Sequence, residues 1–437
     1  LPFDLTNAQA RVIGELRTDL SARIPMNRLL QGDVGSGKTV VAIAAMLLAV
    51  EAGFQAALMA PTQILAEQHY AVLQRWLEPL GVPVSLRTGA RKEDPLPLFS
   101  TGADSGSSPE EQAPLGHVFV GTHALLYEPE GLENPGLVVI DEQHKFGVAQ
   151  RARLTSQEPA PDVLVMTATP IPRTLTMSLY GDLDVSTIDE MPADRGRIVT
   201  AARDEKKLPE VLAFLRRELE ADRQAYIVYP LIDESEKLEA KAAAAEFEKW
   251  RERLEPFTCE LLHGRIPAPE KQATMGRFRR GLTSVLVSTT VIEVGVDVPN
   301  ATVMLIENAE RFGLAQLHQL RGRIGRGGHK SYCILLRSDP SQETIAKLAV
   351  LEKTSNGFEV AEADWELRGP GDLLGTAQSG LPALKLGNLR ADAKLMQRAR
   401  KAALEIFRDD PLLAKLENQR FRHLVVEDGG KTFSHVS

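Results

Sequence analysis

The segment Gly32-Asp33-Val34-Gly35-Ser36-Gly37-Lys38-Thr39 joins the apolar run Leu29–Leu30 to the apolar stretch Val40–Val50. It fits the pattern G-x-x-x-x-G-K-[ST] in the strand–loop–helix context that this pattern requires. Glycines permit positive φ, so successive backbone N–H groups can face one set of phosphate oxygens, and the helix N-terminus adds its positive dipole end. A chance glycine-rich turn is the alternative, but it would not place the Lys-Thr pair in register. The segment therefore predicts a site for the phosphates of ATP.

The side chains of this loop have distinct expected tasks. Lys38 would bridge the β- and γ-phosphates, and the Thr39 hydroxyl would bind Mg²⁺. The rest of the predicted cradle consists of Gly32, Gly35, Ser36 and Gly37.

A pair of carboxylates supplies what such a loop needs next. Asp141 and Glu142 directly follow the apolar run 137–140. We expect this run to be a strand neighbouring that of the phosphate loop, with Asp141 as a Mg²⁺ ligand and Glu142 as the base that polarises the attacking water. The alternative is an acidic pair that only caps the following helix.

Apolar runs alternate with amphipathic helical stretches in two successive segments. Most of the runs are continuously apolar, which is typical of parallel strands covered by helices on both faces. The predicted strands are 28–31, 56–60, 117–120, 137–140 and 163–167 in the first segment, and 226–229, 259–262, 285–288, 303–306 and 332–335 in the second. The pattern predicts an α/β chain with two parallel-sheet lobes, residues 1–192 and 193–338, joined near the hinge Pro192–Gly196.

Residues 339–437 follow a different pattern. They read as a helix Gln342–Lys353, a glycine-rich segment Glu366–Gly380 containing a turn at Arg-Gly-Pro-Gly, a charged helix of about 389–408, and a polar tail. Within the lobes, Glu93–Gly116 is rich in Pro, Ser and Gly and predicts a surface insertion. Lys237–Glu255 is rich in Ala, Glu and Lys and predicts an exposed helix whose charges are a solvated face.

Composition narrows the class of protein. The 437 residues are 43% hydrophobic and 25% charged, with a net charge of −8 and two cysteines. We expect a soluble protein of a reducing cytosol, without a membrane span, disulfide framework or zinc site. The acidic average leaves nucleic-acid binding to local clusters and disfavours a dedicated DNA clamp. Because the first residue is Leu1 rather than Met, we expect that a longer protein continues upstream.

The second segment contains Gln316-Leu-His-Gln-Leu-Arg-Gly-Arg-Ile-Gly-Arg326, in which arginines stand beside glycines. A guanidinium is permanently charged and planar, and it stabilises charge on a transferring phosphoryl group. If the two lobes face each other, Arg323 and Arg326 would be arginine fingers. A basic surface loop is the alternative for these residues taken alone.

Together these motifs resemble a superfamily-2 helicase over almost the whole chain. The resemblance implies an adenine-reading motif at Phe3 and Gln9, and nucleotide contacts by Gly295 and Asp297 near the ribose. It implies nucleic-acid backbone contacts by strand-end residues, namely Pro61, Thr62, Gly121, Thr122, Thr289 and Thr290. It also implies residues that couple hydrolysis to lobe movement, namely Thr167, Thr169 and Gln319.

The segment Ala363–Asp372 with Thr376–Gly380 resembles a translocation motif shared by two families, RecG and the transcription–repair coupling translocase. Arg368 and Gln378 are its expected working residues. Gln31, Ser36, Gln143 and the stretch Leu381–Leu389 favour RecG. Two departures from the family are the insertion Glu93–Gly116, which puts DNA contacts there in doubt, and Lys145 where an arginine is usual.

The RecG resemblance implies an ATP- and Mg²⁺-dependent helicase that moves on duplex DNA and acts on forks and Holliday junctions in recombination and repair. It implies a monomer in the bacterial cytoplasm, associated with the nucleoid, with single-strand-binding protein as a partner. The N-terminal wedge domain of that family is absent from these residues, so we expect weak, structure-insensitive DNA-stimulated ATPase. The alternatives are the coupling translocase acting with RNA polymerase, a slow NTP-controlled switch, and an RNA helicase.

Overall fold

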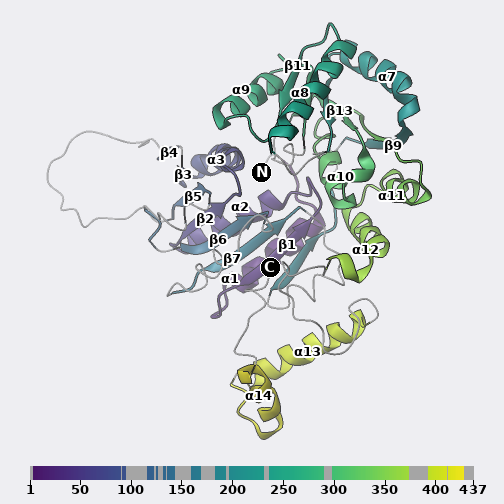
Figure 1. Cartoon of the computed structure of the whole chain (residues 1–437). Helices are drawn as coiled ribbons and strands as arrows, with labels where there is room; N and C mark the ends of the chain where they lie inside the picture. Colours follow the sequence, from purple (N-terminus) through teal and green to yellow (C-terminus); the bar gives the residue numbers. More distant parts are fainter. Residues whose placement is uncertain are drawn as a thin grey trace, which may run out of the picture.

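In the computed structural model, parallel strands are arranged in two sheets, one from each half of the chain (Figure 1). The structure describes residues 3–89, 91–94, 116–122, 125, 131–133, 135–142, 159–168, 183–192, 196–230, 236–289, 298–373, 392–410 and 412–427. The predicted class, α/β with two parallel-sheet lobes, is confirmed.

The sheet of lobe 1 has the strand order β4-β3-β5-β2-β6-β7-β1-β8, and only the pair β3–β4 is antiparallel. Its strands are β1 (Asn27–Gly32), β2 (Gln55–Met59), β3 (Val84–Arg87), β4 (Lys92–Glu93), β5 (Val118–Gly121), β6 (Pro135–Asp141), β7 (Asp162–Thr167) and β8 (Asp184–Ile188). Its described helices are α1 (Asn7–Leu20), α2 (Lys38–Glu51) and α3 (Gln63–Leu77).

Side chains of the central strands alternate between two cores. In β2, Ala56 and Leu58 join α1, α2 and α3 in one hydrophobic cluster, whereas Ala57 and Met59 belong to a cluster on the opposite face. Both faces of the sheet are therefore buried. This explains why the strand sequences are continuously apolar rather than alternating.

The sheet of lobe 2 has the order β11-β12-β10-β13-β14-β9, with all pairs parallel. Its strands are β9 (Ile198–Asp204), β10 (Gln224–Val228), β11 (Cys259–Leu262), β12 (Val285–Ser288), β13 (Ala301–Ile306) and β14 (Ser331–Arg337). The helices α7 (Leu208–Glu220) and α8 (Glu236–Arg253) cover one face. The other is covered by α9 (Ala268–Arg279), α10 (Leu314–Arg321), α11 (Gln342–Lys353) and α12 (Gly357–Leu373).

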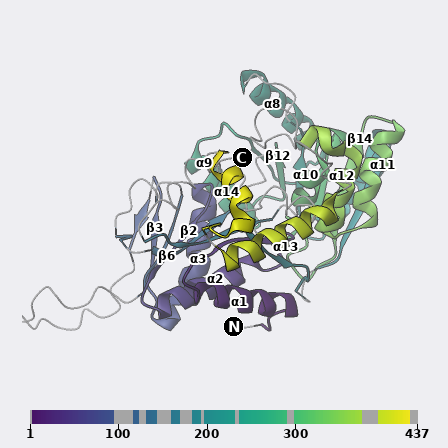
Figure 2. The ribbon, with the colours of Figure 1, turned by 90° about the horizontal axis from the view of Figure 1, so that it is seen from below.

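Two further helices, α13 (Ala393–Asp409) and α14 (Gln419–Glu427), stand below the lobes in Figure 1. Seen from below, α13 runs across the molecule in front of the lobes (Figure 2). Arg400 fixes α13 to lobe 1, because its guanidinium donates to the Leu183 carbonyl at 2.8 Å and lies 3.5 Å from the Asp184 carboxylate.

All ten predicted strands are present, and so are the helix Gln342–Lys353 and, within a few residues, the charged helix near 389–408. Strands β3, β4, β8 and β9 were not predicted. In β8, Asp184, Ser186 and Thr187 interrupt the apolar pattern, because this strand lies at the edge of the sheet. The expected hinge at Pro192–Gly196 and the insertion Glu93–Gly116 lie mostly outside the described residues.

Three other expectations are wrong. The carboxylate pair does not stand on the strand next to β1, because β7 lies between β1 and β6. The helix at Lys237–Glu255 is not simply exposed, since Ala243 and Trp250 are fully buried in the core of lobe 2. Nor does the chain turn at Arg-Gly-Pro-Gly, because α12 continues to Leu373. Its earlier turns bury Val360 and Trp365, and such burial offsets the low helix propensity of Gly and Pro.

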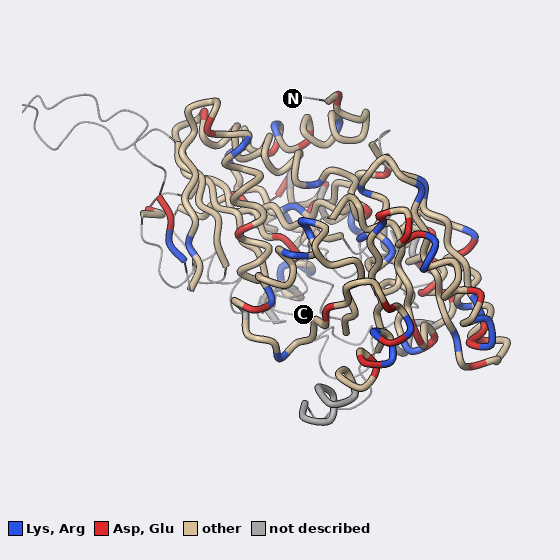
Figure 3. The backbone as a smooth tube through the Cα atoms, turned by 90° about the horizontal axis from the view of Figure 1, so that it is seen from above, with Lys and Arg blue, Asp and Glu red and all other residues tan. Residues whose placement is uncertain are grey.

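Lysines and arginines are interspersed with acidic residues over both lobes (Figure 3). Among the helices that the structure describes, none is long and apolar enough to cross a membrane.

Candidate nucleotide site between the lobes

The phosphate-loop segment lies where three strands of lobe 1 end and lobe 2 faces them. The loop follows β1, Ala168 follows β7, and Asp141 ends β6. Together they border a cleft of about 310 Å³. Its lining residues are Val34, Gly35, Gly37, Lys38, Thr39, Leu65, Gln68, His69, Val72, Asp141, Glu142 and Ala168 from lobe 1, and Gln319, Arg323 and Arg326 from lobe 2. The structure thus brings the predicted phosphate, metal, base and arginine residues to one place.

The loop has the backbone that its glycines suggest. Gly35 and Gly37 have φ of 80° and 86°, in the left-handed region that side chains disfavour. A Cβ at Gly37 would also stand 2.2 Å from the Gln9 amide nitrogen. The Lys38 ammonium donates to the carbonyls of Gly32 and Asp33, at 2.8 and 2.9 Å. Burial lowers the pKa of Lys38, while the nearby carboxylates of Glu142 and Asp141 act in the opposite direction.

Asp141 is held by a residue that the sequence did not point to. His69 of α3 lies with its Nε2 2.8 Å from Asp141 Oδ2. Burial raises the pKa of Asp141. The hydrogen bond with His69 and the positive charge of Lys38 lower it by more than burial raises it, so the pKa lies below its usual value. Asp141 is therefore ionised at neutral pH. The adjacent Glu142 has φ of 53°, a left-handed conformation that is strained for a non-glycine residue and is found mostly at functional sites.

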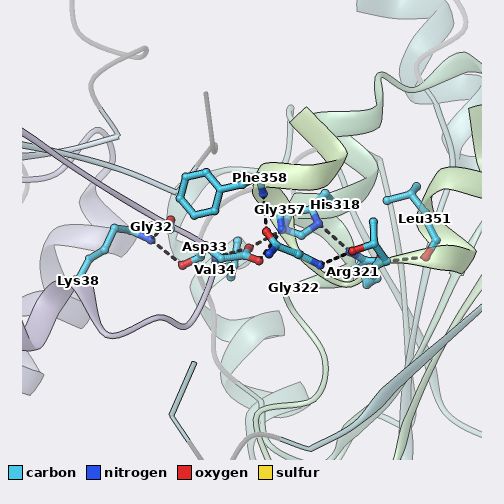
Figure 4. A network of polar contacts seen from close by, with 12 residues as sticks. Gly32, Asp33, Val34, Lys38, His318, Arg321, Gly322, Leu351, Gly357 and Phe358 are labelled. Atoms are coloured by element: carbon cyan, nitrogen blue, oxygen red, sulfur yellow. Dashed lines mark hydrogen bonds and ion pairs between the residues drawn. The ribbon is translucent and has the colours of Figure 1, made fainter. Parts of the chain in front are cut away.

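Lobe 2 closes the cleft with the turn that follows α10. Arg323 and Arg326 line it opposite the carboxylates, and burial together with the charge of Arg326 lowers the pKa of Arg323 to about 10. The approach is close, because a Cβ on Gly322 would lie 2.7 Å from the Cβ of Val34 in the loop. Figure 4 shows Val34 and Gly322 between Lys38 on one side and Arg321 on the other.

Phe3 and Gln9 lie beside the cleft rather than among its lining residues. Gln9 is buried, donates to the Ser36 carbonyl at 2.9 Å and accepts from the Thr6 amide, so it braces the phosphate loop against α1. Phe3 packs on Trp76 with ring centroids 5.5 Å apart. Adenine reading by this pair stays a prediction.

The predicted backbone-contact residues of lobe 1 lie side by side at strand ends. Pro61 and Thr62 follow β2, and Gly121 and Thr122 close the paired strand β5. The Ala60 amide donates to the Gly121 carbonyl at 2.8 Å, and the Thr62 hydroxyl caps α3.

In lobe 2, Thr289 follows β12 and is buried, with 1% of its surface exposed. Among the residues that the structure describes, its hydroxyl has no hydrogen-bond partner. The predicted coupling residue Thr167 ends β7 and pairs in register with Gln31 of β1, directly beside the phosphate loop.

Some expectations fall on residues that the structure does not describe. These are Thr169, Thr290, Gly295, Asp297 and Gln378, together with Gln143, Lys145 and the stretch Leu381–Leu389. Arg368 belongs to α12, but its side chain is not among those that the structure describes.

Comparison with known proteins gives three family matches in succession. Residues 6–178 match the DEAD/DEAH box helicase family, and residues 206–328 match the helicase conserved C-terminal domain. Residues 354–426 match the C-terminal part of domain 3 of the ATP-dependent DNA helicase RecG. The third match spans α12 to α14.

Curated relatives agree with these matches. The chain is 52% identical over 414 residues to the ATP-dependent DNA helicase RecG of Synechocystis sp., covering 94% of this chain and 49% of that protein. It is 45% identical over 435 residues to the RecG of Bacillus subtilis, covering 98% of this chain and 62% of that protein. A solved structure of RecG bound to a three-way DNA junction superposes with a TM-score of 0.72 at 44% identity, covering 91% of this chain and 51% of that one. The chain thus spans about half to three fifths of the length of these relatives.

Proposed function

Because this chain contains the helicase portion of a RecG-type, superfamily-2 protein, we propose that it is an ATP-driven motor on double-stranded DNA. We propose that this motor acts at forks and Holliday junctions, in recombination and repair. One observation carries the proposal: Arg323 and Arg326 of lobe 2 face Lys38, Asp141 and Glu142 of lobe 1 across one cleft. A site that spans two lobes can convert hydrolysis into lobe movement, because each state of the nucleotide changes what the lobes share.

The loop and the carboxylates fit a magnesium nucleotide. The left-handed Gly35 and Gly37 open a cradle of backbone N–H groups, and Lys38 is positioned to move from loop carbonyls to phosphate oxygens. Thr39 and Asp141 would hold Mg²⁺, which when bound neutralises charge on the β- and γ-phosphates. Among the described residues no cluster of three or more His, Cys, Asp and Glu could hold a metal by itself.

In hydrolysis, Glu142 would accept a proton from the water that attacks the γ-phosphorus, while the bond to the β–γ bridging oxygen breaks and ADP leaves. Arg323 and Arg326 would stabilise the charge that develops on the equatorial oxygens. Lobe closure is then needed for hydrolysis, since the arginines belong to the other lobe. Release of phosphate would remove the shared anion and let the lobes separate.

The grip on DNA would lie along the strand ends that carry Pro61, Thr62, Gly121, Thr122 and Thr289, with Thr290 beside them. Small hydroxyls and free backbone N–H groups bind phosphates without reading bases, so a motor built on them can walk over any sequence. Thr167, Thr169 and Gln319 would pass the nucleotide state to this grip, and Arg368 and Gln378 would pull on the duplex. Basic and acidic residues alternate along the backbone of both lobes (Figure 3), which fits DNA binding through a few such contacts.

We include four further points in the proposal. The lobes divide at 192/193 and 338/339, the motor works as a monomer in the bacterial cytoplasm near the nucleoid, branch specificity does not reside in these residues, and single-strand-binding protein is a partner. These rest on the family resemblance.

The test is steady-state ATPase of this chain with no nucleic acid, single-stranded DNA, linear duplex DNA, a model fork and single-stranded RNA, beside Glu142→Gln. We expect DNA with duplex character to stimulate most, the fork and the linear duplex to act alike, and Glu142→Gln to lose turnover by about 10²-fold or more. Best stimulation by RNA would instead identify an RNA helicase. Slow turnover that no nucleic acid changes would indicate a switch.

A further inference from the structure

The phosphate loop has a second side, which faces away from the nucleotide cleft. Asp33 projects from the loop and makes two of its hydrogen bonds with lobe 2 (Figure 4). One carboxylate oxygen lies 2.5 Å from His318 Nε2 of α10, and the other accepts from the Gly357 amide at the start of α12, at 2.9 Å. The Val34 amide donates to the first oxygen as well, at 2.6 Å. Asp33 therefore connects the phosphate loop to two helices of the other lobe.

The protonation of His318 follows from its partners. Arg321 Nη2 lies 2.8 Å from His318 Nδ1, and a guanidinium can only donate. His318 Nδ1 is therefore the acceptor of this contact, and Nε2 is the ring nitrogen that donates to Asp33. All three partners of the Asp33 carboxylate are thus hydrogen-bond donors. Only a side chain that has an acceptor atom at both terminal positions, as a carboxylate has, can satisfy all three.

The chain of contacts continues to the end of α11. Arg321 is buried, with 3% of its surface exposed, and its Nη1 donates to the carbonyls of Leu351 and Thr354 at 2.8 and 2.9 Å. Asp33 and Arg321 thus hold the two ends of the turn 354–356 that joins α11 to α12. We call the set Asp33, His318, Arg321 and Gly357 the loop–hairpin joint.

The joint lies beside free space. A cavity of about 570 Å³ is bordered by Asp33, His318, Arg321 and the turn 354–356, together with the interlobe segment 188–192. If the loop moves when the nucleotide is exchanged, α11 and α12 can therefore move with it into this cavity. A packed core would prevent that movement.

We propose that Asp33 and His318 transmit the nucleotide state of the phosphate loop to the α11–α12 hairpin, as positioning residues that couple hydrolysis to movement. This inference rests on the proposed function, because α12 carries Arg368 of the translocation motif. The Lys38 ammonium donates to the backbone carbonyls of Gly32 and Asp33, and the Asp33 carboxylate bonds to lobe 2 (Figure 4), so a change in what Lys38 binds acts directly on the residue that carries the joint. Neither Asp33 nor His318 lines the nucleotide cleft.

The first experiment compares Asp33→Asn, His318→Asn and His318→Gln in the full chain. Asn at position 33 places an amide donor against a donor. Asn at 318 keeps an acceptor near the position of Nδ1 but loses the link to Asp33, whereas Gln reaches the position of Nε2 and can still donate. Gln272→Ala is the matched control, because it removes another contact between the lobes, from Gln272 to Glu67 at 2.9 Å.

Two rates are measured for each variant: ATPase with duplex DNA, and displacement of a third strand from a triplex by movement along the duplex. We expect both Asn variants to lose about 10-fold or more of displacement per ATP hydrolysed, beyond any change in the ATPase kcat, with His318→Gln restoring much of it. The double variant Asp33→Asn/His318→Asn should be no worse than either single variant, because all three remove one contact. Parallel loss of both rates, or an equal effect of Gln272→Ala, would overturn the proposal.

A second measurement does not depend on DNA. Hydrogen–deuterium exchange of a peptide covering 354–362 is followed with ADP, with a non-hydrolysable ATP analogue and with neither. The proposal predicts that nucleotide changes exchange there in the unaltered chain and not in Asp33→Asn, with nucleotide affinity retained in both. An identical change in both proteins would contradict it. If the unaltered chain neither hydrolyses ATP with DNA nor moves, the motor function fails, while this exchange measurement still decides on the joint.

Discussion

The two sides of the phosphate loop differ in what they offer a ligand. On the cleft side, Lys38 donates to two loop carbonyls and faces Asp141 and Arg323, and the pKa values of Asp141 and Arg323 both lie below their usual ranges. On the joint side, both oxygens of Asp33 are occupied by donors from the protein. Burial raises the pKa of Asp33, but the hydrogen bonds lower that pKa by more than burial raises it. Asp33 is therefore ionised at neutral pH.

This difference separates two tasks in one loop. A group that must exchange a ligand at every turnover needs partners that it can leave, as Lys38 has. A group that must transmit movement needs contacts that persist, as Asp33 has. Substitutions on the cleft side should therefore abolish hydrolysis, and those on the joint side should spare it.

Among the substitutions that test this comparison, we expect Arg326→Ala to have the largest effect on ATP hydrolysis. Removing an arginine finger costs about 10³-fold or more in kcat, because charge on the γ-phosphoryl group is then left uncompensated. Steady-state ATPase measures it, with Arg280→Ala as the control, an exposed arginine at the end of α9 in the same lobe. A loss below about tenfold, or the same loss in the control, would remove Arg326 from the cleft-side account.

The smallest expected effect lies away from both sides of the loop, at Thr289. Thr289→Val preserves shape and deletes a buried hydroxyl that has no partner among the described residues. One hydrogen bond to a charged DNA phosphate is worth about 1.5–3 kcal/mol, so the Kd for duplex DNA should rise about 10- to 100-fold. Fluorescence anisotropy measures that Kd.

The same variant has a built-in check on stability. Because the hydroxyl is unsatisfied in the described structure, its removal should leave Tm unchanged or slightly higher. A lower Tm with unchanged DNA affinity would show that Thr289 has a structural task instead.

The cleft side was predictable from sequence and the joint side was not, for a physical reason. Phosphate binding needs glycines, Lys38 and Thr39 at fixed spacing in one loop, and such spacing is visible in the sequence. The carboxylate pair is visible too, because it directly follows a continuously apolar run. His69 and His318 have no such local pattern. Their partners lie 72 and 285 residues away, so only the folded chain brings them together.

The fold shows the same division. Long, continuously apolar strands such as β6 and β13 were predictable because both of their faces are buried. The edge strands β8 and β9 contain polar residues and are defined by pairing with distant strands. The end of α12 was missed because propensity describes a residue alone, whereas α12 is already packed at Trp365 when it reaches Gly369.

The most direct test of the motor is third-strand displacement from a duplex by the unaltered chain, with ATP, with ADP and with a non-hydrolysable analogue, beside Glu142→Gln. We expect displacement with ATP but with neither ADP nor the analogue, at a rate proportional to ATP turnover. With Glu142→Gln we expect no displacement. Hydrolysis of ATP on duplex DNA without any displacement, or displacement that needs only ATP binding, would contradict it.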